Sequence, residues 1–121
     1  MDKHRTSRDT MAKEKTEVLK GTLDMLILTV VALGPIHGYA ITQRLQQISK
    51  DFFQVPEGSL YPALHRLEDG GWLQAKWEET ETGREVKVYT LTRAGRRRLG
   101  IEMVQWERLS EAVALILKTA E

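Results

Sequence analysis

The chain has 121 residues, 41% of them hydrophobic and 29% charged, which suits one domain built around a single core. Its formal net charge of +1 is nearly neutral, so a surface that attracts nucleic acid must arise from segregated charge and not from excess charge. The absence of cysteine excludes disulfides and thiolate metal sites. The longest apolar stretch, residues 23–33, is too short to span a bilayer, and we expect a cytoplasmic protein with no membrane partner.

The N-terminal part of the chain divides into a polar segment and an apolar one. Residues 1–17 are polar and mixed in charge, and we expect them to form a flexible tail. Thr22 is predicted to cap a helix that continues to Leu33, where Gly34-Pro35 stops it. This helix is apolar on nearly every side, so it needs cover on more than one face. Its own domain would provide one cover and a partner subunit another.

A second helix is predicted to open at His37-Gly38-Tyr39. Its inward side chains, at helical spacing, are those of Ile41, Leu45 and Ile48. The connection before it is short and holds proline and glycine, so the two helices must turn sharply against each other.

The third predicted helix has one apolar and one polar face. With Ser59 as its N-cap, Pro62 falls in the first turn, where its missing N–H had no partner, and Gly70-Gly71 ends the helix after Asp69. The apolar face consists of Leu60, Ala63, Leu64 and Leu67. The polar face consists of Pro62, His65, Arg66 and Asp69, with Ser59 and Tyr61 at its borders.

Two strands and a long helix complete the expected fold. Residues 72–79 and 85–91 favour strand and residues 80–84 favour a turn, which together predict a hairpin. Three helices followed by a hairpin is the order of a winged helix-turn-helix, an α+β and mostly helical fold, here over residues 18–91. Thr92 then caps a last helix that runs to about Lys118.

The segment 92–121 is predicted to be a C-terminal dimerisation helix. At about 1.5 Å per residue it is too long to pack wholly against so small a domain. An apolar stripe with heptad-like spacing runs along it, made of Leu99, Met103, Trp106, Val113, Leu117 and Ala120 and widened by Leu109 and Ile116. A partner subunit is the simplest cover for this stripe. The run Arg96-Arg97-Arg98 is interpreted as a solvated helix start, with attraction towards DNA as the alternative.

Four segments of the sequence resemble the PadR family of transcriptional regulators. They are residues 20–24 (KGTLD), 37–39 (HGY), 57–68 (EGSLYPALHRLE) and 89–95 (YTLTRAG). The single C-terminal helix is similar to that of the small subclass of the family. The resemblance implies a homodimeric, cytoplasmic repressor of the winged-helix type, often tuned by a small molecule. The wing departs from the pattern, since Glu85 follows Arg84 and Val88 stands where family members usually carry a tyrosine.

The third helix is the candidate recognition helix for the major groove of a palindromic operator. Arg66 is expected to read guanine and His65 to donate to or accept from a base, with Pro62 on the same face. Ser59 and Tyr61 suit phosphate oxygens. Further candidates for contacts with the DNA backbone are Tyr39, at the start of the second helix, and Arg84 and Lys87 on the wing.

A small planar effector is a further expectation. Tryptophan at position 106 of the last helix matches a position where similar regulators stack planar aromatic compounds, and Met103 would provide an adaptable wall. Neither the three scattered histidines nor the serines form a metal or catalytic constellation, so no enzyme and no cofactor is expected. The alternative function is a winged-helix module for protein–protein contact.

Overall fold

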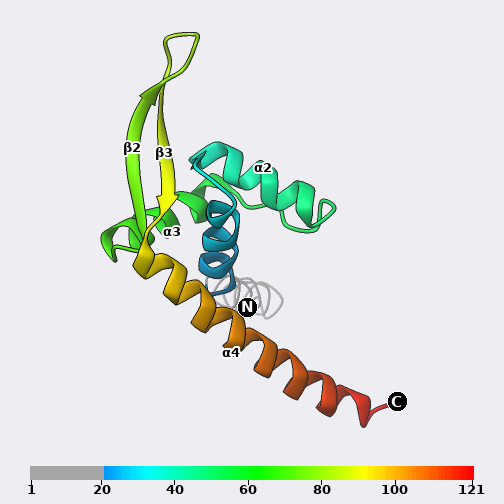
Figure 1. The fold of residues 1–121 in the computed structure, drawn as a ribbon. Helices are drawn as coiled ribbons and strands as arrows, with labels where there is room; N and C mark the ends of the chain where they lie inside the picture. The colour runs from blue at the N-terminus through cyan, green and yellow to red at the C-terminus, as the bar shows by residue number, and fades with distance from the viewer. Residues whose placement is uncertain (1–20) are drawn as a thin grey trace, which may run out of the picture.

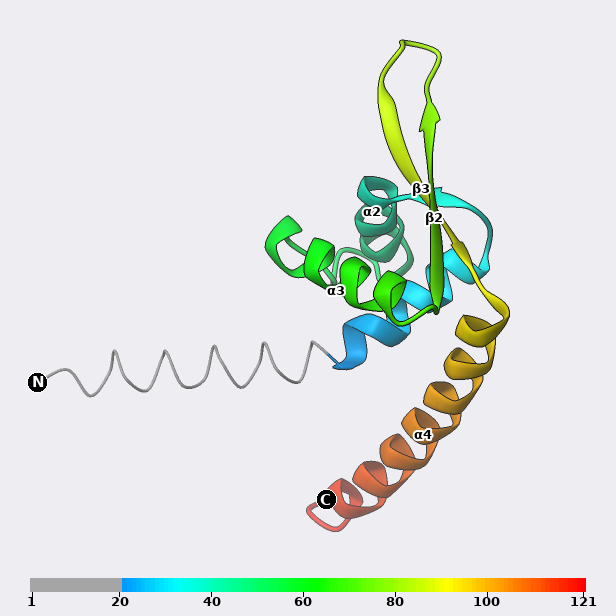
Figure 2. The same ribbon diagram turned by 90° about the vertical axis from the view of Figure 1, so that its left-hand side faces the viewer.

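The computed structural model describes residues 21–121, and the predicted tail over residues 1–17 lies outside this range. After a helix that includes residues 21–32 come β1 (Ile36–His37), α2 (Gly38–Ile48), α3 (Glu57–Asp69), β2 (Leu73–Glu79), β3 (Glu85–Leu91) and α4 (Arg93–Lys118). This order is that of a winged helix-turn-helix with a long C-terminal helix, as the sequence predicted. The β2–β3 hairpin, the wing, rises from the helical head, and α4 runs away from the head in the opposite direction (Figures 1 and 2).

The core of the head forms where the helix over residues 21–32 meets α2, α3 and the base of the wing. The largest side chains in it that are completely or almost completely buried are Ile27, Leu28, Val31, Ile41, Leu60, Leu64, Leu67 and Leu73. The apolar face predicted for the third helix is therefore confirmed. Thr22 is not an N-cap, because Gly21 before it is already helical. The helix ends at residue 32, just before Leu33-Gly34.

The helix α2 begins where the sequence predicted and buries less of its length than expected. His37 is its N-cap, and its Nδ1 accepts a hydrogen bond of 3.3 Å from the backbone N–H of Ala40. Ile41 and Leu45 are buried, but Ile48 is 61% exposed. The prediction for Ile48 was wrong because α2 extends beyond the core before it ends.

The recognition-helix candidate α3 has its N-cap three residues earlier than expected, at Pro56 instead of Ser59. Pro62 consequently lies in the second turn, where its missing N–H leaves the carbonyl of Gly58 without its usual helical partner. The predicted glycine end is confirmed. Gly71 has a positive φ of 79°, its N–H bonds to the carbonyl of Glu68, and the N–H of Trp72 bonds to Leu67, which is a Schellman motif.

The sheet has three antiparallel strands in the order β1-β3-β2. The short strand β1 was not predicted, because two residues are too few to show an alternating pattern. It pairs Ile36 with Tyr89 and so ties the start of α2 to the wing. At the other end of the hairpin, Gly83 takes a φ of 81° in the predicted turn, and the N–H of Thr80 bonds to the carbonyl of Arg84.

The helix α4 buries whole residues against the head only near its beginning. Thr92 is its N-cap and accepts a hydrogen bond of 3.0 Å from the N–H of Gly95, as predicted. Its two buried residues, Gly95 and Leu99, both lie in the first two turns. The exposed apolar residues beyond them are Ile101, Met103, Val104, Trp106, Leu109, Val113, Leu115, Ile116 and Leu117.

Candidate nucleic-acid interface

A groove of about 370 Å³ lies where the start of α2, the middle of α3 and the wing meet. Its lining consists of His37, Gly38, Tyr39, Tyr61, His65, Trp77, Arg84, Glu85, Val86, Lys87 and Tyr89. Three elements far apart in the sequence thus present aromatic, imidazole and cationic side chains to one surface. Phenol and imidazole groups offer both donors and acceptors, and the cations suit phosphate oxygens.

Close packing of α2 on α3 brings the two tyrosines to this groove. Gly38 lies at this contact, since a Cβ there would be 3.4 Å from the ring of Tyr61 and 3.5 Å from Leu64, which is van der Waals distance. Tyr39 is 56% exposed and Tyr61 39% exposed, and both side chains line the groove. This is the amphipathic arrangement that suits contact with a polar ligand.

The predicted site residues divide into two groups. The groove unites Tyr39, Tyr61, His65, Arg84 and Lys87. Three others lie elsewhere. Ser59 lines a separate apolar hollow of about 330 Å³ with Phe52 and Phe53, and Pro62 is exposed on α3 outside the groove lining.

Arg66, the third residue outside the groove, points to the helix over residues 21–32. Its Nη2 donates to Oδ1 of Asp24 at 2.9 Å, and the Asp24 side chain is only 13% exposed. In this arrangement the guanidinium is occupied by a carboxylate. A contact with guanine through Nη2 would compete with this pair.

Lys87 in the groove is also paired. Its Nζ lies 2.8 Å from Oε1 of Glu68 and 5.6 Å from the centre of the Tyr89 ring. The hydrogen bond that Lys87 donates to Glu68 raises the pKa of Lys87, and burial raises the pKa of Tyr89. At neutral pH the ammonium is therefore charged and the Tyr89 phenol is neutral. Arg84, at the exposed end of the wing, forms no ion pair within the described chain.

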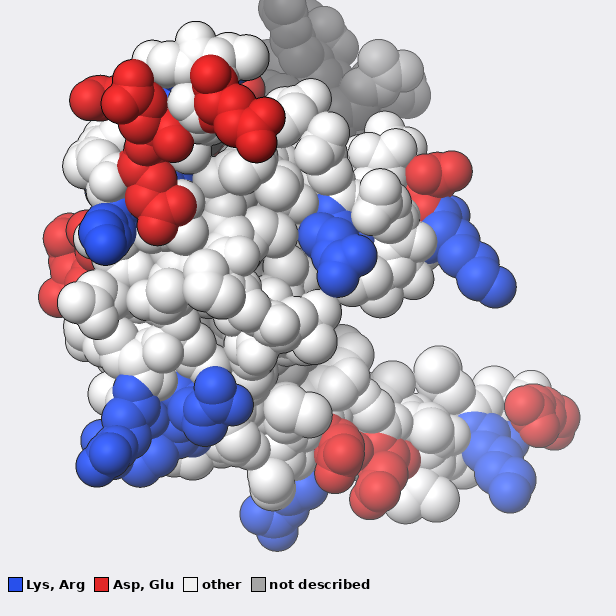
Figure 3. Space-filling view, turned by 45° about the horizontal axis from the view of Figure 1, so that its top comes forward, with Lys and Arg blue, Asp and Glu red and all other residues white. Residues whose placement is uncertain are grey.

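Charge is unevenly distributed over the head. The wing carries exposed acidic side chains at Glu78, Glu79, Glu81 and Glu85, and acidic groups dominate that part of the surface in Figure 3, at the upper left. A basic cluster covers the beginning of α4, at the lower left of the same view. The acid at position 85 enters the groove itself, so the wing presents mixed charge to any polyanion.

The sequence did not predict the structural roles of two groups of residues. Trp77 stands 63% exposed on the wing and lines the groove, and strand alternation alone does not reveal which side of a hairpin faces a neighbouring helix. The second group is Asp24 with Arg98. For Arg98, the i,i+4 spacing to Glu102 could have predicted the ion pair that the two side chains form within α4.

A second cavity of about 330 Å³ lies between the helix over residues 21–32 and α4. Its lining consists of Gly21, Thr22, Met25, Glu102, Gln105, Trp106 and Leu109. Trp106, the expected ligand residue, is 48% exposed and forms part of this lining, whereas Met103 does not. Oε2 of Glu102 is buried and takes no hydrogen bond within residues 21–121.

Fold and groove together define a winged helix-turn-helix protein. A family model for the transcriptional regulator PadR-like family matches residues 27–101, and the chain belongs to this family. A transcriptional regulator of Mycobacterium tuberculosis is 35% identical over 97 residues, which cover 80% of this chain and 87% of that protein. The negative transcriptional regulator PadR of Bacillus subtilis is 29% identical over 91 residues, covering 75% of this chain and 50% of its own length.

Solved structures agree with this assignment. A PadR-family transcriptional regulator from Eggerthella lenta superposes with a TM-score of 0.75 at 29% identity, covering 93% of this chain and 96% of its own. A transcriptional regulator from Clostridium thermocellum also gives 0.75, at 26% identity, covering 80% of this chain and 94% of its own.

The protein is accordingly a DNA-binding transcriptional regulator, of a family of regulators and not of enzymes. Over residues 21–121, no helix combines the length and the apolar character that crossing a membrane requires. In the same range, no three histidine or acidic side chains gather as a metal site.

Proposed function

We propose that the protein is a homodimeric repressor that reads a palindromic operator, with α3 of each subunit in the major groove of one half-site. The supporting observation is the groove, where the exposed side of α3 is framed by Tyr39 and Tyr61 and flanked by the wing. A helix fits the major groove of B-DNA, where base edges differ in their donors and acceptors. Such a protein works where the chromosome is, in the bacterial cytoplasm. Repression is proposed because the Bacillus subtilis relative is named a negative regulator.

We assign the following roles to the side chains of the groove. His65 is exposed on α3 and reads a base edge, while the hydroxyls of Tyr39 and Tyr61 donate to phosphate oxygens on either side. Arg84 supplies a phosphate contact from the wing. Lys87 can contact a phosphate only if it gives up its ion pair with Glu68, so its contribution to DNA affinity is smaller than that of Arg84.

Three further residues keep secondary roles. Ser59 and Pro62 lie on α3 beside its DNA-facing surface, where a hydroxyl serves a phosphate and the proline ring packs against the sugar backbone. Arg66 stabilises the position of α3 through its ion pair with Asp24, and His65 is the residue that reads a base.

The dimer rests on α4. Beyond Leu99 the helix carries exposed apolar side chains for the rest of its length, among them Val113 at 44% and Leu117 at 65% exposure. Large exposed apolar stripes of this kind mark contact surfaces. A second copy of α4 would bury them and place the two heads on one face of the duplex, as a palindrome requires.

The experiment is selection of bound duplexes from a random-sequence pool, followed by a salt titration. The proposed function predicts enriched inverted half-sites and an affinity that falls steeply as salt rises, because phosphate contacts release condensed counterions. Enriched sequences without an inverted repeat would contradict the dimeric reading. The second candidate function, protein–protein contact, is favoured by the acidic wing and predicts weak binding to every duplex.

We further propose that a planar cation releases the repressor from its operator by entering the cavity beside Trp106. The indole supplies a stacking face, and the unpaired Oε2 of Glu102 supplies an acceptor for a positively charged donor. Met103, outside this cavity, contributes only if the partner subunit completes the slot.

Binding of a planar dye cation, ethidium, tests the effector site. It should quench tryptophan fluorescence in the wild type and not in Trp106→Ala, while Trp72 and Trp77 continue to report on the fold. Quenching that persists in Trp106→Ala would place the dye elsewhere. The matched variant Glu102→Gln should weaken binding of the cation without changing binding of a neutral planar compound.

A further inference from the structure

A cluster of charged side chains outside the groove lining joins α4 to the recognition-helix candidate. Arg98, on α4, donates from Nε to Oε1 of Glu102 at 2.9 Å, and its Nη2 lies 4.0 Å from Oδ2 of Asp24. Oδ1 of the same aspartate accepts from Arg66 on α3 at 2.9 Å. The Arg98 guanidinium also lies 3.9 Å from the centre of the Trp72 ring. A continuous chain of contacts thus runs from α4 to α3.

The first turn of α4 is fixed to the backbone of the same tryptophan. Oγ1 of Thr92 lies 2.7 Å from the carbonyl oxygen of Gly71 and 3.0 Å from that of Trp72. Gly95 packs so closely that a Cβ there would lie 2.1 Å from the Trp72 carbonyl oxygen. One turn further on, Arg98 stacks on the ring, so backbone and side chain of Trp72 both define how α4 leaves the head.

We propose that Arg98 is a positioning residue that sets the angle between α4 and the recognition helix, and thereby the half-site spacing that the dimer accepts. This inference rests on the dimer and the palindromic operator of the proposed function. A planar guanidinium can stack on an indole, donate a hydrogen bond to one carboxylate and form an ion pair with a second, and a flexible ammonium cannot hold all three in one geometry. Asp24 links the position of Arg98 on α4 to α3, because the same carboxylate also pairs with Arg66.

The length of α4 makes this angle matter. Half of its 26 residues, at about 1.5 Å each, give a lever of about 20 Å between the head and the middle of the helix. A rotation of about 10° at the head shifts the middle of α4 by roughly 3.5 Å relative to the recognition helix, close to the rise of one base pair. Loss of the cluster therefore changes the register between the two recognition helices and the DNA.

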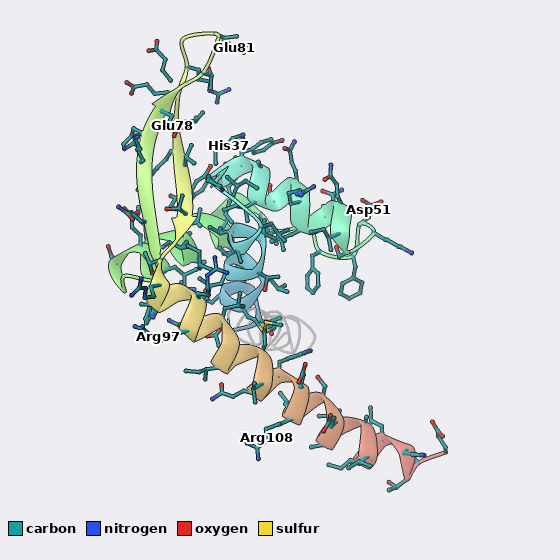
Figure 4. All side chains as sticks on the ribbon, in the orientation of Figure 1. His37, Asp51, Glu78, Glu81, Arg97 and Arg108 are labelled. Carbon is teal, nitrogen blue, oxygen red and sulfur yellow. The ribbon has the colours of Figure 1, made fainter. Side chains whose placement is uncertain are left out.

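Arg97 separates this role from simple attraction to DNA. It belongs to the same basic run, but it is exposed and projects from α4 away from the helical head (Figure 4). If Arg98 acted only as a positive charge, removing the charge of Arg97 would have the same consequences. If Arg98 positions α4, only its own replacement alters the geometry of the dimer.

The test uses the full chain and a duplex selected by the wild type, remade with half-site spacings one and two base pairs shorter and longer. The wild type should prefer its own spacing by about tenfold or more, a discrimination typical of one wrong base pair. In Arg98→Gln this preference should fall to roughly threefold or less, and Arg97→Gln should keep the wild-type profile.

A purely structural role would lower affinity for all spacings by one common factor, and that result overturns the proposal. Arg98→Lys is the milder variant should Arg98→Gln fail to fold. It keeps the charge beside Asp24 and Glu102 and should still flatten the profile, at an unchanged melting temperature. An Arg98→Lys protein with the wild-type profile also overturns the inference. A wild type that is monomeric contradicts the proposed function itself, which sedimentation of the free protein reveals separately.

Discussion

The head and the outer part of α4 use apolar residues in opposite ways. In the head, Leu64 and Ile27 are completely buried, and helices and wing cover one another within a single chain. Beyond Leu99, α4 carries comparable side chains that the described chain leaves about half or more exposed, and Leu115 is 68% exposed. The same residue types thus stabilise the subunit in one region and provide the proposed contact between subunits in the other. Loss of an apolar side chain should have different consequences in the two regions.

The largest effect is expected where the contact between subunits is broken. Val113→Glu combined with Leu117→Glu places carboxylates on the apolar stripe, where burial of unpaired charge is costly. The protein should sediment as a monomer with a folded head. Its operator affinity should fall by about 10²–10⁴-fold, because two linked half-site contacts become one.

The control for this double variant is Arg108→Glu, which changes the net charge by the same amount. Arg108 lies on the other side of α4 from the stripe, by the 100° step of a helix. The Arg108→Glu protein should therefore remain a dimer. A dimer that survives the double variant but not Arg108→Glu would move the contact to that other side.

Truncation of one leucine in each region makes the comparison directly. Leu64→Ala empties space in a fully packed core and should lower the free energy of unfolding by about 2–5 kcal/mol. Leu115→Ala, off the stripe, should change it by less than about 0.5 kcal/mol. Urea unfolding at several protein concentrations measures both. A large loss for Leu115→Ala would mean that the partner covers α4 on more than the stripe.

Sequence discrimination should depend on the groove and not on the charged cluster behind it. His65→Ala should cost about 1–3 kcal/mol on the selected operator and relax the preference at one base pair. Arg84→Ala should weaken all duplexes alike and reduce the salt slope by about one. Arg66→Ala should also weaken all sequences equally, because its partner is Asp24. Binding to operators with single base-pair changes distinguishes these outcomes. A relaxed preference in Arg66→Ala would restore it as a guanine reader.

Most of the fold could be predicted from the sequence because each element carries local signals. The glycine pair after α3, the Thr92 cap and the helical spacing of Leu60 and Leu64 depend only on neighbours along the chain. The N-cap of α3 was predicted three residues late, because Ser59 is a favourable cap and the side chain of Pro56 cannot accept a capping hydrogen bond.

The site was less predictable, because its geometry depends on contacts between distant residues. A helical wheel correctly places Arg66 on the polar side of α3, but the partner that takes up its charge is 42 residues away. Periodicity likewise shows that Arg96, Arg97 and Arg98 point in different directions. It does not show that, of these three arginines, only Arg98 contacts a tryptophan ring and two carboxylates in the described chain.

The smallest effect is expected from the pair that ties α3 to the wing, Lys87 with Glu68. Both side chains are partly exposed, so Lys87→Met should lower the free energy of unfolding by only about 0.2–1 kcal/mol at neutral pH. The pKa of Lys87 is raised above 10.5 by its hydrogen bond to Glu68. The contribution of the pair is therefore complete below pH 10.5 and disappears as the pH rises through the higher folded-state pKa. Urea unfolding of wild type and Lys87→Met should thus differ at pH 7 to 9 and converge well above pH 10.5. A difference that grows in alkali would show that the ammonium is not what stabilises this contact, and that the wing and α3 are joined by the neighbouring Tyr89 instead.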